Sequence, residues 1–344
     1  FEEMEDVIEE RGENPVEEYG FMGPHQTINN LYGSLLRPGN ITVIVARSGV
    51  GKTQFCMDFC TKTSLSYKNV PVLHFDNGEM SKEEIMNRQC AALSGVQLHL
   101  IETGKWRRAG EETVKKMRQA LAQVKDMKFY YYNVGGMSVD SMINVVKRFY
   151  YSKVGRGNRM ILSFDYIKTT FEKFNTKTEW QVVGEMVDKF KRLVQKEVVF
   201  EGDPMIAMMT SVQSNRSGIV GNRNSDSVVD DESIVSLSDR IIQFSSHLLS
   251  LRQKTLDELQ NEPADFGSHR LTCIKHRHLG PEVYRALTPV EMPDGSRRKN
   301  SINLEINNFN VTDKGDLKDL ADNMDLNDIE AENGNNFFEA PQFS

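Results

Sequence analysis

Short apolar runs alternate with segments of helical periodicity along most of the chain. The runs are rich in β-branched, aromatic and methionine residues, and lie at Ile41–Val45, Val70–Phe75, Phe129–Val134, Met160–Phe164 and Met205–Thr210. Helix-like segments stand between them, at Lys82–Leu93, Glu111–Val124, Val139–Tyr151 and Trp180–Val199. Strands that are apolar on both faces and alternate with helices are typical of a buried parallel sheet. The pattern therefore predicts an α/β fold with a mostly parallel sheet covered on both faces.

The regions outside this alternation are more polar and divide the chain into three parts. Residues 1–22 are charged, and we expect a linker or docking helix there that ends near Asn14 and Pro15. Residues 23–312 form the predicted main domain. Within it, the polar stretch 214–238 predicts a functional or mobile loop, and residues from about 240 to 312 predict strands and hairpins without clear helices.

Residues 313–344 carry regularly spaced aspartates and little apolar content, which predicts a disordered acidic tail. Three phenylalanines near its end, Phe337, Phe338 and Phe343, favour a segment that docks on a partner over an inert solubilising tail.

Charge and composition narrow the function classes. The net charge of −7 arises from this tail, and the remaining residues are neutral overall. Any nucleic-acid contact must therefore come from local loops and not from a broad basic face. No apolar stretch approaches the roughly 18 residues that a membrane span needs. The four cysteines form no C-x-x-C pair, which favours reduced core thiols in a cytosolic protein. Because the chain begins at Phe1 with an acidic run, we expect a fragment or processed chain without a signal peptide.

One motif carries specific chemistry. After the first apolar run the chain reads Ala46, Arg47, Ser48, Gly49, Val50, Gly51, Lys52 and Thr53, followed by Gln54. This fits the phosphate-loop pattern G-x-x-x-x-G-K-[ST] except at its first position, where alanine replaces glycine. A strand that feeds such a loop into a helix directs backbone N–H groups at an anion. We therefore expect ATP or another nucleoside triphosphate, with Lys52 at the β/γ-phosphates and Thr53 at Mg²⁺. The structural alternative is a glycine-rich turn with a solvated lysine.

Carboxylates at two other strand ends complete the predicted hydrolytic site. Asp165 follows the run Met160–Phe164, where a carboxylate can reach the magnesium ion. Glu79 lies just past the second run and is a candidate general base for the attacking water. Asp76 competes for that role, and Glu79 could instead be a first-turn helix acid.

Five blocks in this order resemble those of DnaB-family replicative helicases. The first is the phosphate loop beginning Ala46-Arg47, and the second runs from Glu79 through Arg88 to Val96. The others are Phe164-Asp165-Tyr166, the stretch Ser211–Arg216, and Ile274–Arg277 followed by Gly280-Pro281. Together they cover roughly residues 25–310.

The resemblance implies a RecA-like ATPase domain, with a mostly parallel twisted sheet and C-terminal β-hairpins, that assembles as a hexameric ring. Glu79 would activate water, and Asp165 with Thr53 would hold magnesium. Gln213 would sense the γ-phosphate, and Lys275 and Arg277 would act on the nucleotide of the next subunit. Arg88 is implied to pack on the base. The residues Asn215, Arg216, Arg223 and Asn224 are candidate contacts to a DNA backbone, although the segment 232–239 departs from the family pattern.

We therefore expect the motor domain of a replicative DNA helicase that encircles single-stranded DNA in a bacterial or phage-infected cytoplasm. The tail resembles those of phage ring helicases, so primase, a loader or a polymerase are the expected partners, and no membrane. The alternatives are a RecA-like recombinase or KaiC-like ATPase, a viral DNA-packaging motor, and a nucleotide-bound clamp or loader partner that has lost turnover.

Overall fold

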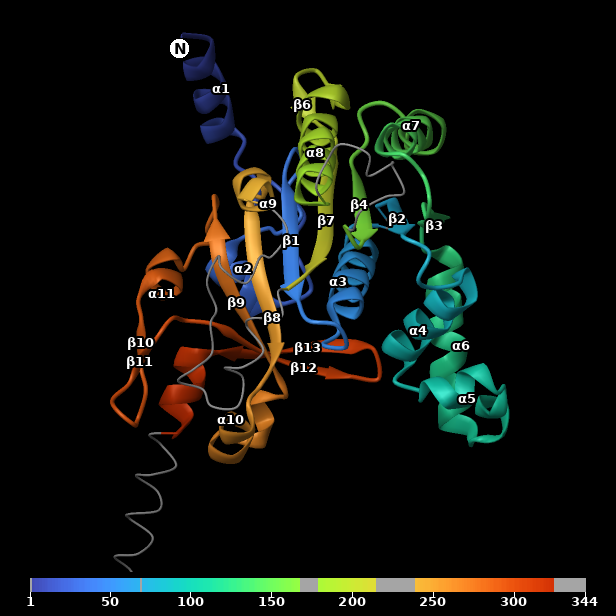
Figure 1. The fold of residues 1–344 in the computed structure, drawn as a ribbon, viewed down its shortest axis with the longest axis vertical. Helices are drawn as coiled ribbons and strands as arrows, with labels where there is room; N and C mark the ends of the chain where they lie inside the picture. Colours follow the sequence, from blue (N-terminus) through green and yellow to red (C-terminus); the bar gives the residue numbers. More distant parts are fainter. Residues whose placement is uncertain (1, 69, 168–178, 215–238, 325–344) are drawn as a thin grey trace, which may run out of the picture.

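The structure, a computed structural model, describes residues 2–68, 70–167, 179–214 and 239–324. Its centre is a nine-stranded sheet in the order β13-β12-β9-β8-β1-β7-β4-β2-β3 (Figure 1). The strands are β1 Ile41–Ala46, β2 Val72–Asp76, β3 Phe129–Asn133, β4 Met160–Asp165, β7 Ile206–Gln213, β8 His247–Gln253, β9 His269–His276, β12 Ile302–Asn307 and β13 Asn310–Asp316. The six strands from β8 to β3 are parallel, whereas β9, β12 and β13 join by antiparallel pairing. The predicted mostly parallel sheet with C-terminal hairpins is confirmed.

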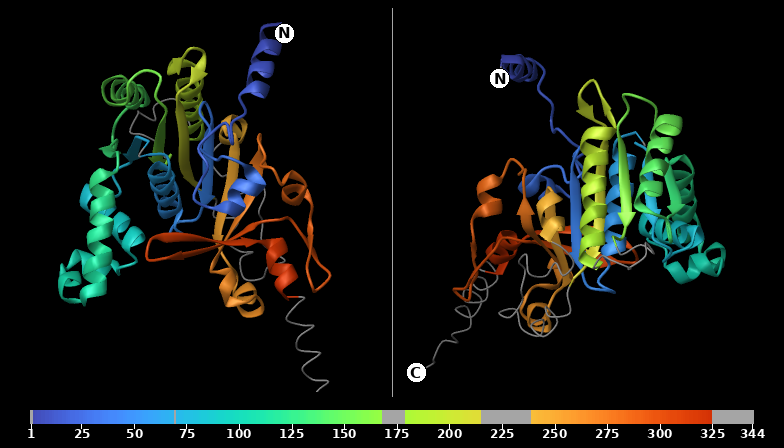
Figure 2. Two further views of the ribbon diagram at one scale, coloured as in Figure 1. Left: turned by 180° about the vertical axis from the view of Figure 1, so that it is seen from behind. Right: turned by 45° about the horizontal axis from the view of Figure 1, so that its top comes forward.

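Helices lie on both faces of the sheet (Figures 1 and 2). The main ones are α2 Gln26–Tyr32, α3 Lys52–Ser66, α4 Lys82–Ser94, α6 Glu111–Asp126, α7 Val139–Phe149 and α8 Glu179–Arg192. Shorter elements are α5 Leu98–Glu102, the 3₁₀ helix η1 Lys105–Arg108, α9 Asp239–Phe244, α10 Leu256–Asn261 and α11 Val283–Leu287. Two small hairpins pair β5 Val199–Phe200 with β6 Asp203–Pro204, and β10 Val290–Glu291 with β11 Arg297–Arg298.

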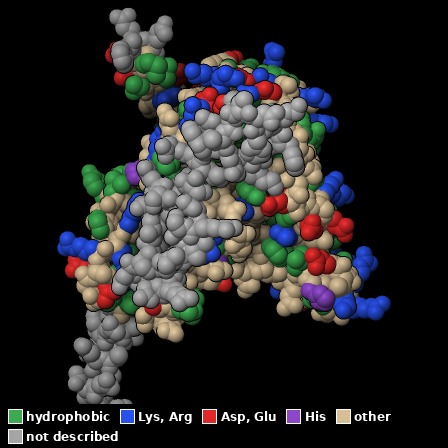
Figure 3. All heavy atoms as spheres, in the orientation of Figure 1, with side chains coloured by type: hydrophobic (Ala, Val, Ile, Leu, Met, Phe, Trp, Pro, Cys, Tyr) green, Lys and Arg blue, Asp and Glu red, His purple; other side chains and the backbone are tan. Residues whose placement is uncertain are grey.

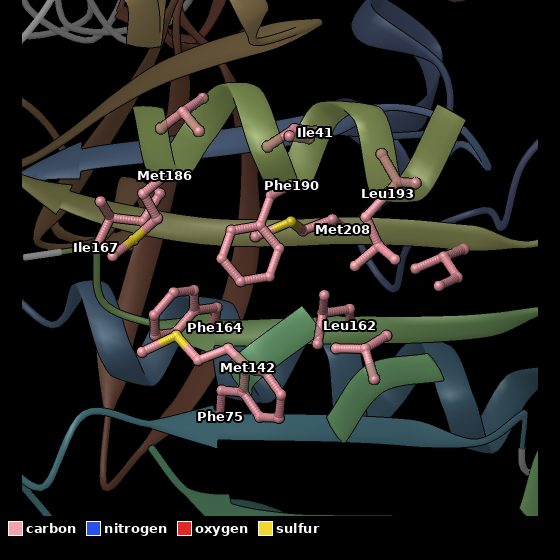
Figure 4. Packing of buried hydrophobic residues seen from close by; sticks show 14 of the residues in the cluster. Ile41, Phe75, Met142, Leu162, Phe164, Ile167, Met186, Phe190, Leu193 and Met208 are labelled. Atoms are coloured by element: carbon pink, nitrogen blue, oxygen red, sulfur yellow. The ribbon is translucent and has the colours of Figure 1, made fainter. Parts of the chain in front are cut away.

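The core has two layers because successive strand residues point to opposite faces. On one face Val43 and Val45 of β1 pack with α7 and α8, while on the other Ile44 and Ala46 pack with α2 and α3. Figure 4 shows Phe190 of α8 packed against Phe164 of β4. The edge strand β3 is only partly covered, so the double coverage predicted for every strand is wrong there.

Two predicted boundaries differ from the structure. The main domain begins before residue 23, since Phe21 is buried and its backbone pairs with Leu36. The tail predicted from 313 is wrong for its first twelve residues, because β13 continues to Asp316 and residues 317–324 are helical. Leu317 and Leu320 of this helix are buried, and this apolar spacing outweighs the acidic composition. Residues 325–344 lie outside the described part of the chain.

The regions that flank the sheet add two further findings. The prediction of residues 240–312 without clear helices is wrong, since α10 and α11 lie wholly within that range. The predicted N-terminal helix is present as α1 Glu2–Glu13 and stands away from the body (Figures 1 and 2). Within the described ranges, no helix is long and apolar enough to cross a membrane.

Candidate nucleotide site

The phosphate loop joins β1 to α3 and has the backbone that its sequence requires. Gly49 has φ 82° and Gly51, which caps α3, has φ 100°. A side chain rarely adopts these values, so glycine is needed at both positions. A Cβ at Gly49 would meet no atom within 4 Å, and Arg47 and Ser48 are exposed. The loop therefore leaves open space in front of the N-terminus of α3, where an anion is favoured.

The first residues of α3 contact two aromatic residues. Lys52 is nearly buried, with its ammonium 4.3 Å from the centre of the Tyr166 ring. Gln54 donates a hydrogen bond to the carbonyl of Phe309, in the turn between β12 and β13. The guanidinium of Arg88 lies 5.2 Å from the centre of the Phe309 ring. Phe309 thus links the phosphate-loop helix to α4, which carries Arg88.

Asp165 ends β4 and has one carboxylate oxygen without a hydrogen-bond partner among the described residues. Its Oδ1 accepts a hydrogen bond from Ser211 Oγ at 3.0 Å, while Oδ2 is buried and unsatisfied in this part of the chain. A buried carboxylate oxygen is costly unless a ligand satisfies it. Oxygen ligands suit Mg²⁺, which is bound by few protein side chains together with phosphates. The site therefore fits Mg²⁺ bound with a nucleotide, with Asp165 and Thr53 as the candidate protein ligands.

The described residues contain no separate metal centre beside this site. Across the parts of the chain that the structure describes, no group of three or more His, Cys, Asp or Glu side chains could hold an ion. The four cysteines are free and buried, as predicted.

The geometry separates the two candidate bases. Asp76 is fully buried at the end of β2 and accepts hydrogen bonds from the backbone N–H groups of Gly78, Glu79 and Met80. Burial raises the pKa of its carboxyl, against the lowering effect of those N–H groups. Glu79 is exposed, and its carboxylate accepts a hydrogen bond from Tyr166. Burial, followed by the charge of Glu79, raises the pKa of Tyr166 to about 12. Asp76 thus shapes the turn, and Glu79 is free to meet a water molecule.

Strand register brings the predicted groups to one edge of the sheet. Asp76 is level with Asp165 on neighbouring strands, and Ala46 is level with Gln213. Gln213 is exposed at the end of β7, the strand between β1 and β4. The phosphate loop, Glu79, Asp165 and Gln213 therefore share the carboxyl edge of the parallel strands, where ligands bind in open α/β sheets.

Lys275 and Arg277 lie at the opposite edge. His247 is level with both Thr42 of β1 and His276 of β9, so the end of β9 lies about 13 Å along the strands from Ala46. Lys275 donates a hydrogen bond to the carbonyl of Ile242, and Arg277 Nη2 donates one to Gln243 O at 2.7 Å. Both cations therefore contact the C-terminal end of α9, and neither reaches the phosphate loop of its own chain.

Sequence reasoning missed the three residues that support the site. Tyr166 contacts both Lys52 and Glu79, Phe309 contacts Gln54 and Arg88, and Ser211 holds Asp165. The position of Tyr166 directly after Asp165 was a usable signal, whereas nothing near Phe309 in the sequence marks it. The predicted DNA contacts Asn215, Arg216, Arg223 and Asn224 lie outside the described residues.

Comparison with known proteins points to one family. Residues 25–219 match the family model of the DnaB-like helicase C-terminal domain. The replicative DNA helicase DnaB of Buchnera aphidicola subsp. Baizongia pistaciae is 40% identical over 80 residues, which cover 23% of this chain and 17% of that protein. DnaB of Pasteurella multocida is 41% identical over 69 residues, 20% of this chain and 14% of that protein. The matches thus span about a sixth of these relatives' length.

Solved structures show the same fold. A DnaB-like replicative helicase, described with its interactions with primase, superposes with a TM-score of 0.67 at 17% identity, covering 91% of this chain and 66% of that one. A second solved structure, of an isolated ATPase domain, superposes with a TM-score of 0.68 at 17% identity, covering 90% of this chain and 97% of that one. With the family model matching more than half of its residues, the chain belongs to the DnaB-like helicase C-terminal domain family.

Proposed function

We propose that this chain is the motor domain of a replicative DNA helicase, which hydrolyses ATP to move along single-stranded DNA. One observation carries the proposal: Lys52, Glu79, Asp165 and Gln213 share one sheet edge, and Lys275 and Arg277 lie at the other. A complete hydrolytic set combined with distant cations suits a site that a second copy of the chain completes.

The hydrolytic roles follow from the contacts. Backbone N–H groups of the loop from Arg47 to Gly51 would bind phosphate oxygens, and Lys52 would move from the Tyr166 ring to the β/γ-phosphates. Mg²⁺, held by Thr53 and Asp165, would supply positive charge at the β/γ-phosphates. Glu79 would accept a proton from the attacking water, with Tyr166 fixing its carboxylate through a hydrogen bond. Arg88 and Gln54 would lie beside the nucleotide, where both contact Phe309.

The second copy would supply the cations that this site lacks. In a ring of six chains, Lys275 and Arg277 of one subunit would face the nucleotide of the next and stabilise charge on the transferred phosphoryl group. Gln213 would relay the state of the γ-phosphate to the following loop. The candidate DNA contacts in that loop are Asn215, Arg216, Arg223 and Asn224, which would line the channel around a single strand.

The partners and cellular setting follow from the same proposal. A structural relative is described with primase, and we propose primase, a loader or a polymerase as partners of this chain. The segment 325–344, acidic and ending in phenylalanines, is the candidate contact for a polymerase. The setting would be a bacterial cytoplasm, or that of a phage-infected host.

Two linked measurements test the proposal. We expect the protein to unwind a forked DNA substrate with ATP, and single-stranded DNA to stimulate hydrolysis, with both activities abolished in Lys52→Ala. DNA strand exchange without fork unwinding would instead support a recombinase. ATP turnover that ignores single-stranded DNA, together with no unwinding, would refute the helicase proposal.

Mixing two inactive variants tests the shared site. Lys52→Ala lacks its own phosphate lysine, and Arg277→Ala lacks the cation offered to a neighbour. In mixed rings, an Arg277→Ala subunit beside a Lys52→Ala subunit has an intact phosphate loop and an intact partner arginine. We therefore expect mixing to restore part of the ATPase activity, whereas an arginine acting within its own chain would give no recovery.

A further inference from the structure

A basic groove lies between η1 and the first two turns of α6, at the end of the molecule beyond β3. It is an open hollow of about 600 Å³. It is lined by Arg107, Arg108, Gly110, Glu111, Val114, Lys115, Arg118 and Gln119. In Figure 3 this region, around α5 and α6, lies at the lower right, where several Lys and Arg side chains are exposed. The groove is separate from the phosphate loop, because α4 stands between α6 and the sheet (Figure 1).

The cations of the groove have no charged partner among the described residues. Arg107, Arg108, Lys115 and Arg118 are all exposed, and none of them forms an ion pair with any residue that the structure describes. Arg107 lies over the Trp106 ring, 5.1 Å from its centre. The lining includes one acidic residue, Glu111. Four such cations around one hollow repel each other, so an anion that enters the groove lowers their electrostatic energy.

The groove is built on a rigid support. The opposite face of α6 buries Met117 and Ala120, with Met117 in a cluster that includes Ala91 of α4 and Phe309. Lys115 and Arg118 are three residues apart and lie on the face turned away from this cluster. Since the helix is held on its inner side, the spacing of the outer charges is set before any ligand arrives.

The lining favours phosphate over a protein partner. Val114 is its only apolar side chain apart from stem carbons, whereas protein interfaces depend on buried aromatic or aliphatic anchors. Three of the four cations are arginines, whose planar guanidinium binds phosphate through two parallel hydrogen bonds. Contacts of this kind position a nucleic-acid backbone without reading its sequence.

We propose that this groove binds the phosphate backbone of a DNA strand, as a second contact outside the channel of the ring. The inference rests on the proposed function, since it assigns a further site to a protein that acts on DNA. It also explains how a chain whose body has no net charge can hold DNA through a local cluster.

The test compares two double variants of equal charge. Arg107→Gln with Arg118→Gln removes two groove cations, and Lys125→Gln with Lys128→Gln removes two cations outside the groove. The probe is a fluorescent thirty-residue oligothymidylate, titrated at several salt concentrations. Removing one phosphate contact to a single strand lowers the slope of log K against log salt by roughly 0.7, so we expect the groove variant to lose about 1.4 and the control to lose little. In parallel, Gln119→Cys carrying a photo-crosslinker should label the oligonucleotide, and less so in the groove variant.

Three results would overturn the inference. The first is an unchanged salt slope with no crosslink at position 119. The second is loss of ring assembly in the groove variant alone, which would make the groove a contact between subunits. The third is a decaglutamate peptide that binds the groove as tightly as the oligonucleotide at the same salt, which would make it a protein-docking site. Because the readout is binding, failure of the wild-type protein to unwind DNA would count against the proposed function and leave the groove result to stand alone.

Discussion

A buried cluster of charges below β8 and β9 gives a quantitative test of the structure. Arg252 donates two hydrogen bonds to Glu258, at 2.6 and 2.8 Å, and Arg270 lies 3.7 Å from the same carboxylate. Arg270 and Lys254 also pair with Glu262. The Glu258 side chain is only 2% exposed, and its carboxylate also closes the capping box of α10.

Replacing Glu258 by Gln should be strongly destabilising. Burial alone would raise the pKa of this carboxyl, but hydrogen bonds from Arg252 and the charge of Arg270 outweigh it and lower the pKa from 4.5 to about 2. That difference corresponds to roughly 3 kcal/mol of stability at neutral pH. It agrees with the roughly 3–5 kcal/mol typical of breaking one buried ion pair, so we expect Glu258→Gln to lower the free energy of unfolding by about 3 kcal/mol.

The dependence on pH distinguishes this mechanism from a loss of packing. Because the pKa is lower in the folded state, the stabilisation is complete above pH 4.5 and is lost as pH falls towards 2. Urea unfolding of wild type and Glu258→Gln at pH 7 and pH 4 should show the gap narrowing by roughly 1 kcal/mol. Glu112→Gln, at an exposed helix pair, serves as the control and should leave the midpoint nearly unchanged. An equal gap at both pH values would refute the electrostatic account.

Three other substitutions have definite expected outcomes. Asp76→Ala should reduce ATP hydrolysis at least tenfold with ATP affinity nearly unchanged, because the N–H groups that orient the Glu79 turn lose their acceptor; a matching loss of affinity for a fluorescent ATP analogue would contradict this. Phe190→Ala should lower the free energy of unfolding by about 3–5 kcal/mol in urea titrations, since the ring is fully buried in the core, and a cost below about 1 kcal/mol would show that the site collapses. Gly51→Ala should cost about 1–3 kcal/mol because φ is 100°, and an unchanged melting temperature would mean that the loop adopts another backbone.

The parallel half of the sheet could be predicted because its strands are short, apolar on both faces and separated by regular helices. The phosphate loop, Glu79, Asp165 and Gln213 follow directly from strand ends, so local sequence placed them at one edge. The antiparallel half was harder to predict. Its strands alternate with short helices such as α10, whose stability comes from the Glu258 ion pairs and not from helical periodicity.

Long-range contacts set the limit of sequence reasoning at the site. Asn308 and Phe309 form the β12–β13 turn, and both have positive φ, which asparagine tolerates and phenylalanine rarely adopts. Asn308 donates to the carbonyl of Val96 at 2.8 Å and accepts from the N–H of Leu98. These contacts stabilise a backbone that the local sequence does not favour. The role of this turn beside Gln54 therefore appears only in the folded chain.

The contact between Gln54 and Phe309 also has a consequence for synthesis of the protein. The phosphate-loop helix lies near the start of the chain, yet its support comes from a turn 255 residues later. The central strand β1 likewise pairs with β7 and β8, both made long after it. A nascent chain therefore cannot complete its nucleotide pocket until the last hairpin has left the ribosome. ATP is thus excluded as an early folding aid and becomes a ligand only of the nearly finished domain.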